Sequence, residues 1–270
     1  MLKKISQIVQ KVGYKLLEWR EQKIFTGIWQ QETVKATVDR LAHDMLVTEL
    51  LLLDAMIPVI SEEDEASLVQ QRPTLYWLID PIDGTASFIK GFSGFVTQIA
   101  LMQNNRPIIT AVYAPLLKTL YTAELGQGSF CNNNRLQICT KTAITTLIDN
   151  YPEPRGSTLC LFNDLNFSYY VESGSIALKI CKVADNSAHV FFKDVAIRDW
   201  DIAAPQLILE EAGGFLSKLN GEKFTYTGSY QHTGLIATTS IFQAQKVVDW
   251  YRKFDIEQTE HKKNYERVSV

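Results

Sequence analysis

The chain contains 270 residues, of which 46% are hydrophobic and 21% charged, a composition typical of a globular protein with one large or two closely packed domains. Its 27 Lys and Arg residues nearly balance 30 Asp and Glu residues, so the net charge is −3. Because binding to nucleic acid generally requires a basic surface, this balance argues against nucleic acid as a general partner.

The cellular location of the protein and the redox state of its cysteines are predicted from the absence of membrane, signal and metal-binding patterns. No apolar run reaches the roughly 18–20 residues that cross a bilayer, and polar residues interrupt the first ten residues too often for a signal peptide. We therefore predict a cytoplasmic protein, monomeric or homodimeric, whose N-terminal lysines could hold it peripherally at the inner membrane surface. The cysteines lack CxxC or zinc-ligand spacing and are predicted to be reduced thiols: Cys131, Cys139, Cys160 and Cys181.

The first half of the chain predicts two helices followed by a mainly antiparallel sheet. Apolar residues recur at helical spacing over residues 3–22, and a second helix is predicted from about Val38 to Ala55. Two short apolar strands that end in acids follow, at 58–61 and 75–80. Polar turns join two predicted hairpins, which comprise the strand pairs 95–103 with 107–113 and 119–124 with 129–131.

The second half predicts an α/β arrangement. A stretch at 141–156 with two prolines and a glycine is the predicted boundary between an N-terminal half, 1–145, and a C-terminal half, 146–256. The residues after 256, 257–270, are polar and are expected to fray. Predicted strands at 157–162, 189–193 and 234–238 alternate with predicted helices at 174–184, 202–212 and 241–253.

The segment from Asp80 to Thr85, Asp-Pro-Ile-Asp-Gly-Thr, carries the strongest chemical signal. Gly84 permits a tight turn that would fold Asp83 back beside Asp80. Two carboxylates so close repel each other, and a divalent cation with a preference for oxygen ligands, above all Mg²⁺, would remove the conflict. Backbone N–H groups at Gly84 and Thr85, at the start of a predicted helix, could bind a phosphate by donating hydrogen bonds to its oxygens. A simple strand-to-loop corner is the structural alternative.

Two further acidic positions could join this site. Glu62 ends the strand before that of Asp80, although a solvated acidic cluster would look the same. Asp201 precedes a predicted helix, where an ordinary N-cap is the alternative reading. Asp199, two residues earlier, is a weaker candidate for a metal ligand.

Taken together, these stretches resemble the inositol monophosphatase family of lithium-sensitive, Mg²⁺-dependent phosphatases. The resemblance extends from about residue 5 to 255, and five stretches carry it in the family's order. They are Ser-Glu-Glu at 61–63, Trp-Leu-Ile-Asp-Pro-Ile-Asp-Gly-Thr at 77–85, Gly-Ser at 174–175, Trp-Asp-Ile-Ala-Ala at 200–204 and Glu-Ala-Gly-Gly at 211–214. The resemblance implies an α+β fold, a layered αβαβα sandwich with the site where its two halves meet, and most metal ligands in the first half.

The resemblance also implies roles for individual residues. Two or three Mg²⁺ ions would be held by Glu62, Asp80, Asp83, Asp201 and the Ile82 carbonyl. Thr85 with Glu62 would orient the attacking water, and Asp39 would support Thr85. The phosphate or its leaving group would contact Gly84, Thr85, Gly174 and Ser175.

The segment around Asp39 departs from the family pattern. Ala36 stands where the family has Thr, and Lys35 is either a cation of the site or a solvated lysine. This departure bears on the surroundings of a third metal ion rather than on a two-metal core.

Details within the family favour one branch. Ser-Glu-Glu-Asp at 61–64, Ser-Phe-Ile-Lys at 87–90 and Val-Tyr-Ala-Pro at 112–115 resemble the 3'(2'),5'-bisphosphate nucleotidases, which convert adenosine 3',5'-bisphosphate to AMP. The alternatives are an inositol monophosphatase acting on an inositol phosphate, a sugar bisphosphatase, or a catalytically silent metal-binding member of the family.

Overall fold

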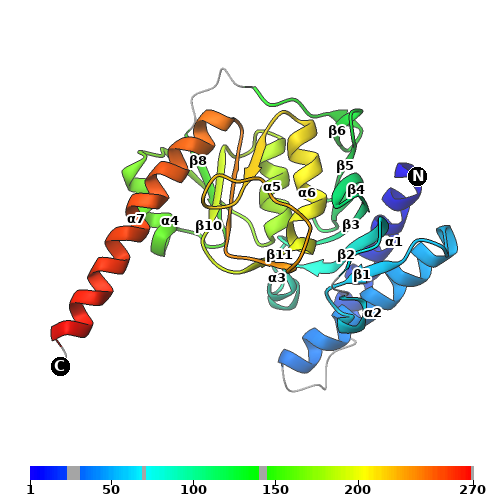
Figure 1. Ribbon diagram of the computed structural model, residues 1–270. Coiled ribbons are helices and arrows are strands. Elements are labelled where there is room, and N and C mark those ends of the chain that lie inside the picture. The colour runs from blue at the N-terminus through cyan, green and yellow to red at the C-terminus, as the bar shows by residue number, and fades with distance from the viewer. Residues whose placement is uncertain (23–30, 69–70, 140–144, 269–270) are drawn as a thin grey trace.

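The computed structural model describes residues 1–22, 31–68, 71–139 and 145–268. Helices and sheets alternate in five layers, which Figure 1 shows from right to left. The sequence-based expectation of an αβαβα sandwich is thereby confirmed.

A seven-stranded sheet forms the second layer, and its strands follow one another in chain order. The first two strands are parallel and all other neighbours are antiparallel. Helices α1 (Leu2–Glu21) and α2 (Gln31–Leu53) cover its outer face. The strands are β1 (Val59–Ser61), β2 (Leu75–Asp83), β3 (Val96–Gln103), β4 (Arg106–Ala114), β5 (Thr119–Glu124), β6 (Gly128–Cys131) and β7 (Asn134–Arg135).

The alternation of side chains along β2 explains how this sheet can bury both faces. Trp77 and Ile79 pack with α1 and α2, whereas Tyr76 and Leu78 point to the opposite face. Successive residues of a strand point to opposite faces, so a continuous apolar run is what a sheet covered on both sides requires.

Two central helices fill the third layer, α5 (Ile176–Ala184) and α6 (Asp199–Glu211). Both belong to the core that joins the two sheets. Most residues of α6 are buried, including Leu207 and Ile208. A helix that is apolar around its circumference has no solvent-facing side, which matches its position between sheets.

A second, five-stranded sheet and two outer helices complete the layers. The helices are α4 (Gly156–Asp164) and α7 (Ile241–Val268). In spatial order the strands are β12 (Phe215–Ser217), β14 (Leu235–Thr238), β10 (Val190–Lys193), β8 (Thr146–Asp149) and β9 (Tyr169–Glu172). The smaller elements are η1 (Glu65–Ser67), α3 (Thr85–Lys90), β11 (Ile197–Arg198) and β13 (Gln231–His232).

Both predicted hairpins are confirmed. Asn104 and Asn105, between β3 and β4, have φ angles of 50° and 59°, and this pair of positive angles suits the right-handed twist of a two-residue hairpin. Gly126 and Gly128, with φ angles of 74° and 93°, serve the turn between β5 and β6.

The predicted strand at 157–162 is wrong, because this segment lies within α4. Thr158 and Leu161 are its buried residues, and their spacing of three is a helical period. A short apolar run does not distinguish a buried strand from a helix. The strands of this region are β8 and β9, which the sequence analysis did not identify.

The predicted end of the last helix at residue 253 is also wrong, because α7 continues to Val268 and includes residues 257–268 of the polar segment. This end of α7 projects away from the layers in Figure 1. Glu, Gln, Lys and Arg, all good helix formers, supply more than half of the segment, so local propensity favours the helix there. Helices α2 and α6 likewise begin earlier than predicted, at Gln31 and Asp199.

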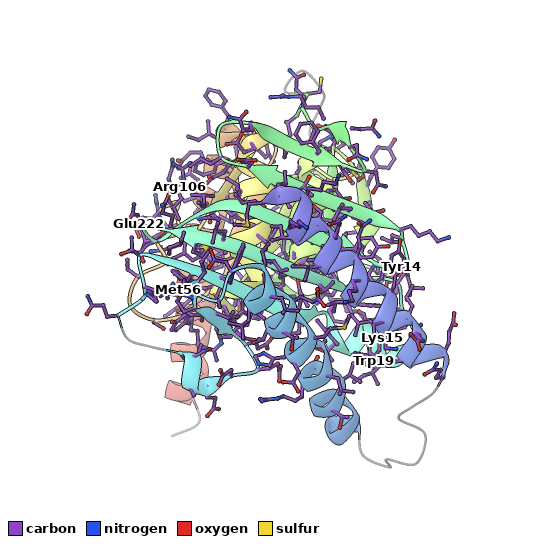
Figure 2. The ribbon with its side chains drawn as sticks, turned by 90° about the vertical axis from the view of Figure 1, so that its right-hand side faces the viewer. Tyr14, Lys15, Trp19, Met56, Arg106 and Glu222 are labelled. Carbon is purple, nitrogen blue, oxygen red and sulfur yellow. The ribbon has the colours of Figure 1, made fainter. Side chains whose placement is uncertain are left out.

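Figure 2 shows α1 and α2 lying across the outer face of the seven-stranded sheet. On the outer side of α1, Lys11 pairs with Glu49 at 2.6 Å and Lys15 with Glu18 at 2.8 Å. Within the described residues, none of the helices combines the length and apolar character that a membrane span requires.

We expect Leu207→Ala to lower the free energy of unfolding by about 2–5 kcal/mol, because it leaves a cavity between the two sheets. Urea denaturation of the purified protein measures this loss. Leu52→Ala is the matched control, since Leu52 is 78% exposed, and should change the free energy by less than about 0.5 kcal/mol. Equal effects of both substitutions would contradict the layered core.

Candidate metal site and adjoining pocket

Two carboxylates of the site come from the end of β2. The pairing of β2 with β3 is regular up to Asp80 and irregular between Asp80 and Asp83. Asp80 Oδ1 accepts a hydrogen bond from the Ile82 N–H at 3.0 Å. This irregularity brings two acids three residues apart to one end of the strand, as a β-bulge does.

The third carboxylate, Asp201, comes from the first turn of α6. Its Oδ2 accepts the backbone N–H of Arg198 at 2.6 Å, so Asp201 occupies the third helical position of a capping box and not the N-cap. Carboxylate oxygens of Asp80, Asp83 and Asp201 lie within 4.8 Å of one another. The tertiary fold thus joins acids that are more than a hundred residues apart.

The electrostatics of this cluster favour a bound cation. Burial raises the pKa of Asp80 well above its ordinary value, and the negative charges of Glu62, Asp83 and Asp201 raise it further. Burial and the charge of Asp83 also raise the pKa of Asp201. Among the described residues, no Lys or Arg forms an ion pair with the three aspartates. Buried charges are normally paired or bind metals, so the cluster could bind a metal ion.

Asp83 also joins the halves of the molecule. Its Oδ2 accepts the Ala177 N–H at 2.6 Å and its Oδ1 accepts the Ile176 N–H at 3.3 Å, both at the start of α5. Burial raises the pKa of Asp83, whereas these N–H groups and the charge of Lys179 lower it. Ser175 caps the same helix by accepting the Leu178 N–H at 2.9 Å.

Glu62 lies beside the cluster at the end of the neighbouring strand. The parallel register pairs Ser61 with Ile79, so the next residues, Glu62 and Asp80, leave the sheet at the same edge. Glu62 is exposed and does not belong to the group within 4.8 Å, but its charge raises the pKa of Asp80 and Asp201. The structure therefore brings it near the metal site as a fourth carboxylate.

Thr85 is bracketed by two acceptors. Its Oγ1 lies 3.0 Å from the Ile82 carbonyl oxygen and 3.3 Å from Asp39 Oδ1. One hydroxyl proton serves one acceptor at a time, so donation to Asp39 leaves the Ile82 carbonyl available to another partner. The side chains of Lys35 and Ala36 lie outside the described residues.

Close backbone packing brings the predicted phosphate contacts together. Gly84 has a φ of 87°, which permits the turn from β2 into α3. A Cβ atom on Gly174 would lie 2.3 Å from Ser87 Oγ and 2.6 Å from the Gly94 carbonyl oxygen. Glycine at 174 therefore allows the loop before α5 to contact the loop after α3.

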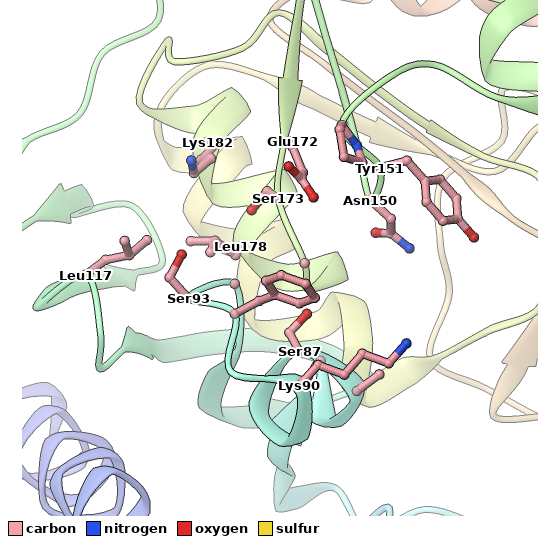
Figure 3. Close-up of a pocket in the computed structure, with 16 residues that line it drawn as sticks. Ser87, Lys90, Ser93, Leu117, Asn150, Tyr151, Glu172, Ser173, Leu178 and Lys182 are labelled. Atoms are coloured by element: carbon pink, nitrogen blue, oxygen red, sulfur yellow. The ribbon is translucent and has the colours of Figure 1, made fainter. Parts of the chain in front are cut away.

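A pocket of about 640 Å³ opens beside this packing, and Gly84, Ser173 and Gly174 are among the residues that line it. Its volume is within the range of about 300–1,000 Å³ that is usual for small-molecule sites. In Figure 3, Lys182 stands at the upper left and Lys90 at the lower right, with Tyr151 and Glu172 above. The pocket thus offers cations, a carboxylate and an aromatic ring.

Asp199 is engaged elsewhere. Arg72 Nη1 lies 2.5 Å from Asp199 Oδ2, and His232 Nε2 lies 2.6 Å from Asp199 Oδ1. Asp199 is fully buried, and Arg72 and His232 are the partners of its carboxylate. These contacts anchor the start of α6.

Two polar residues near the site, Gln98 and Lys179, were not predicted from the sequence. Gln98 Nε2 lies 3.5 Å from Asp80 Oδ2, and its only sequence signal is a polar residue within the apolar strand β3. Lys179 is fully buried in α5, and burial lowers its pKa to about 8, while the charges of Asp149 and Asp83 oppose that shift. A lysine within the apolar stripe of a predicted helix was the available signal for Lys179.

Comparison with known proteins identifies the fold and the family. The crystal structure of 2'AMP-bound SaIMPase-II superposes with a TM-score of 0.77 at 22% identity, covering 94% of this chain and 96% of that chain. The fold is thus that of the inositol monophosphatases. The profile of the inositol monophosphatase family matches residues 3–249, and the chain belongs to this family of phosphatases.

Two relatives illustrate the range of the family. The 3'(2'),5'-bisphosphate nucleotidase CysQ of Salmonella typhimurium is 29% identical over 237 residues, which are 84% of this chain and 94% of that protein. Inositol monophosphatase 1 of Bos taurus is 31% identical over 207 residues, 72% of this chain and 73% of that protein.

We expect Asp80→Asn to raise the melting temperature of the metal-free protein at neutral pH, because it removes one of the mutually repelling buried charges. The raised pKa of Asp80 determines how stability depends on pH. As the pH rises from the ordinary pKa of 3.8 through the higher folded-state pKa, the folding stability of metal-free wild type falls, because Asp80 ionises less readily in the folded than in the unfolded protein. The advantage of the variant should therefore shrink toward acid pH. Thermal denaturation in EDTA measures it, and Mg²⁺ should stabilise wild type more than the variant.

Proposed function

We propose that this protein is a Mg²⁺-dependent phosphomonoesterase acting on a small metabolite. The observation that carries this proposal is the cluster of Asp80, Asp83 and Asp201, whose carboxylate oxygens lie within 4.8 Å of one another. Asp80 and Asp83 are buried, and no Lys or Arg forms an ion pair with the three acids among the described residues. All its donors are oxygens, which suit Mg²⁺ better than zinc or copper. A catalytically silent protein would have no reason to keep such repelling acids.

Different residues of the chain would bind the metal ions and orient the water. Two or three ions would be held by Glu62, Asp80, Asp83, Asp201 and the Ile82 carbonyl. Bound Mg²⁺ supplies positive charge for the phosphoryl oxygens and lowers the pKa of water.

Thr85 and Glu62 orient the attacking water. The Thr85 hydroxyl donates its proton to Asp39 and presents its oxygen to the water, while Glu62 accepts a hydrogen bond from it. The water then attacks phosphorus in line with the departing alcohol, so the reaction needs no protein nucleophile.

The pocket supports a bisphosphate nucleotidase that converts adenosine 3',5'-bisphosphate to AMP and phosphate. Lys90 and Lys182 can neutralise a second phosphate, and the exposed rings of Phe92 and Tyr151 can stack on a purine. The CysQ relative matches over nearly its whole length.

Inositol monophosphatase activity is the second candidate. The identity of 31% to inositol monophosphatase 1 supports it. Glu172 in the pocket wall could accept hydrogen bonds from the hydroxyl groups of a polyol. The same hydroxyl recognition would suit a sugar bisphosphate.

Measurement of the phosphate released from each compound distinguishes among these candidate substrates. We expect the purified protein with Mg²⁺ to hydrolyse adenosine 3',5'-bisphosphate faster than inositol monophosphate or a sugar bisphosphate. Asp83→Asn should lower the rate by more than about 100-fold, beyond the effect typical of residues that only support a ligand. Its circular dichroism spectrum is the folding control. Wild-type turnover by this variant would refute Asp83 as a ligand, and no hydrolysis of any substrate by wild type would refute the enzyme.

The pocket lysines provide a second test of substrate class. Lys90→Met and Lys182→Met should each raise KM for adenosine 3',5'-bisphosphate by about tenfold, equal to about 1.4 kcal/mol. They should change KM for inositol monophosphate much less, because it carries no second phosphate. Lys246→Met, at an exposed position on α7, is the matched control. Equal changes for both substrates would exclude a second phosphate between these lysines.

A further inference from the structure

A buried histidine on α2, His43, contacts the strand end that carries Glu62. His43 is 5% exposed, and its Nδ1 lies 2.8 Å from the Oγ of Ser61, which is fully buried. His43 contacts neither the pocket nor any of the three clustered aspartates among the described contacts. The catalytic proposal above gives this buried pair no role.

The Ser61 hydroxyl organises the turn around Glu62. Its oxygen accepts the backbone N–H of Glu63 at 3.3 Å, so the residues on both sides of Glu62 are held by one hydroxyl group. The Ser61 N–H donates to Ser67 Oγ at 3.1 Å, and Ser67 Oγ donates to the Asp64 carbonyl at 2.6 Å. The turn is therefore closed on itself, with Ser61 at its centre.

The direction of the hydrogen bonds assigns a role to the imidazole. Since Ser61 Oγ accepts from Glu63, its own proton can donate to Nδ1 of a neutral His43 ring. Burial lowers the pKa of His43, which favours the neutral ring. Hydrogen bonds then run from the Glu63 N–H to the Ser61 oxygen and from the Ser61 hydroxyl to His43 Nδ1, so both of these protons have an acceptor.

Asp39 lies one helical turn before His43, on the same face of α2. Asp39 accepts the Thr85 hydroxyl at 3.3 Å, and His43 Nδ1 lies 2.8 Å from the Ser61 hydroxyl oxygen. The same helix therefore contacts both Thr85 and the turn that presents Glu62.

We propose that His43 is a positioning residue that holds Glu62 in place through Ser61. Because α2 contacts both Thr85 and the Glu62 turn, this helix would fix the separation between Glu62 and Thr85. This inference rests on the proposed function, because it assigns Glu62 to the metal site. His43 touches no reacting atom in this proposal. Its loss should weaken Mg²⁺ binding and water positioning with little change in the binding of the organic part of the substrate.

The test uses the full-length protein and Mg²⁺ alone as the probe. Ser61→Ala removes the central hydroxyl, and His43→Leu removes its acceptor. The Mg²⁺ concentration giving half of the maximal rise in melting temperature should increase about tenfold or more, as for other residues that support metal ligands. His43→Asn should remain near wild type, since the Asn Oδ1 can take the place of Nδ1. Phosphate release should show a lower kcat with little change in KM.

Ser217→Ala is the matched control. Ser217 is a fully buried serine of β12 whose hydroxyl has no hydrogen-bond partner among the described residues. Its substitution should leave the Mg²⁺ midpoint unchanged.

The outcomes separate this inference from the enzyme proposal. Wild-type midpoints in Ser61→Ala and His43→Leu would overturn the positioning role, even if wild type binds Mg²⁺ and hydrolyses substrate. A His43→Asn variant that folds but binds as weakly as His43→Leu would overturn the hydrogen-bond mechanism. If His43→Leu does not fold, Ser61→Ala decides alone. A wild type that neither binds Mg²⁺ nor releases phosphate would instead refute the proposed function.

Discussion

The repulsion among Asp80, Asp83 and Asp201 is the constraint on which the site depends. Three carboxylates within 4.8 Å of one another, two of them buried, disfavour the folded state at neutral pH unless positive charge compensates them. The surroundings compensate only in part, through backbone N–H groups at the start of α5 and the buried Lys179. The remaining negative charge could be compensated by a cation, so stability of the metal-free protein and the proposed function oppose each other there.

The layered fold explains how this repulsion is contained. Asp80 and Asp83 stand at the end of a strand covered on both faces, and Asp201 stands in the first turn of a helix between two sheets. Such positions cannot relax by moving apart, because the cores on either side are closely packed. The ion pair of Arg72 with Asp199 fixes the same helix start from the other side.

The pocket and the supporting contacts lie around this centre in a consistent way. Gly84, the residue after Asp83, lines the pocket together with Gly174, where close backbone contact joins the loop before α5 to the loop after α3. In the proposed reaction the metal ligands come from the ends of strands and from α6, and the pocket loops provide substrate specificity. Thr85 and Glu62 orient the water, and α2 contacts both Thr85 and the turn that carries Glu62.

The sequence by itself determined the β3–β4 and β5–β6 hairpins and the acids that end two neighbouring strands, and its resemblance to a known family implied the layered fold class. The hairpins and the strand ends depend on local patterns, such as alternating apolar residues or an Asn-Asn turn. Only the tertiary structure decided that 157–162 is a helix, that Asp199 pairs with Arg72, and that His43 meets Ser61. Those outcomes depend on contacts between residues far apart in the chain, which no local spacing encodes. The sequence could name Asp80, Asp83 and Asp201, but only folding brings their oxygens together.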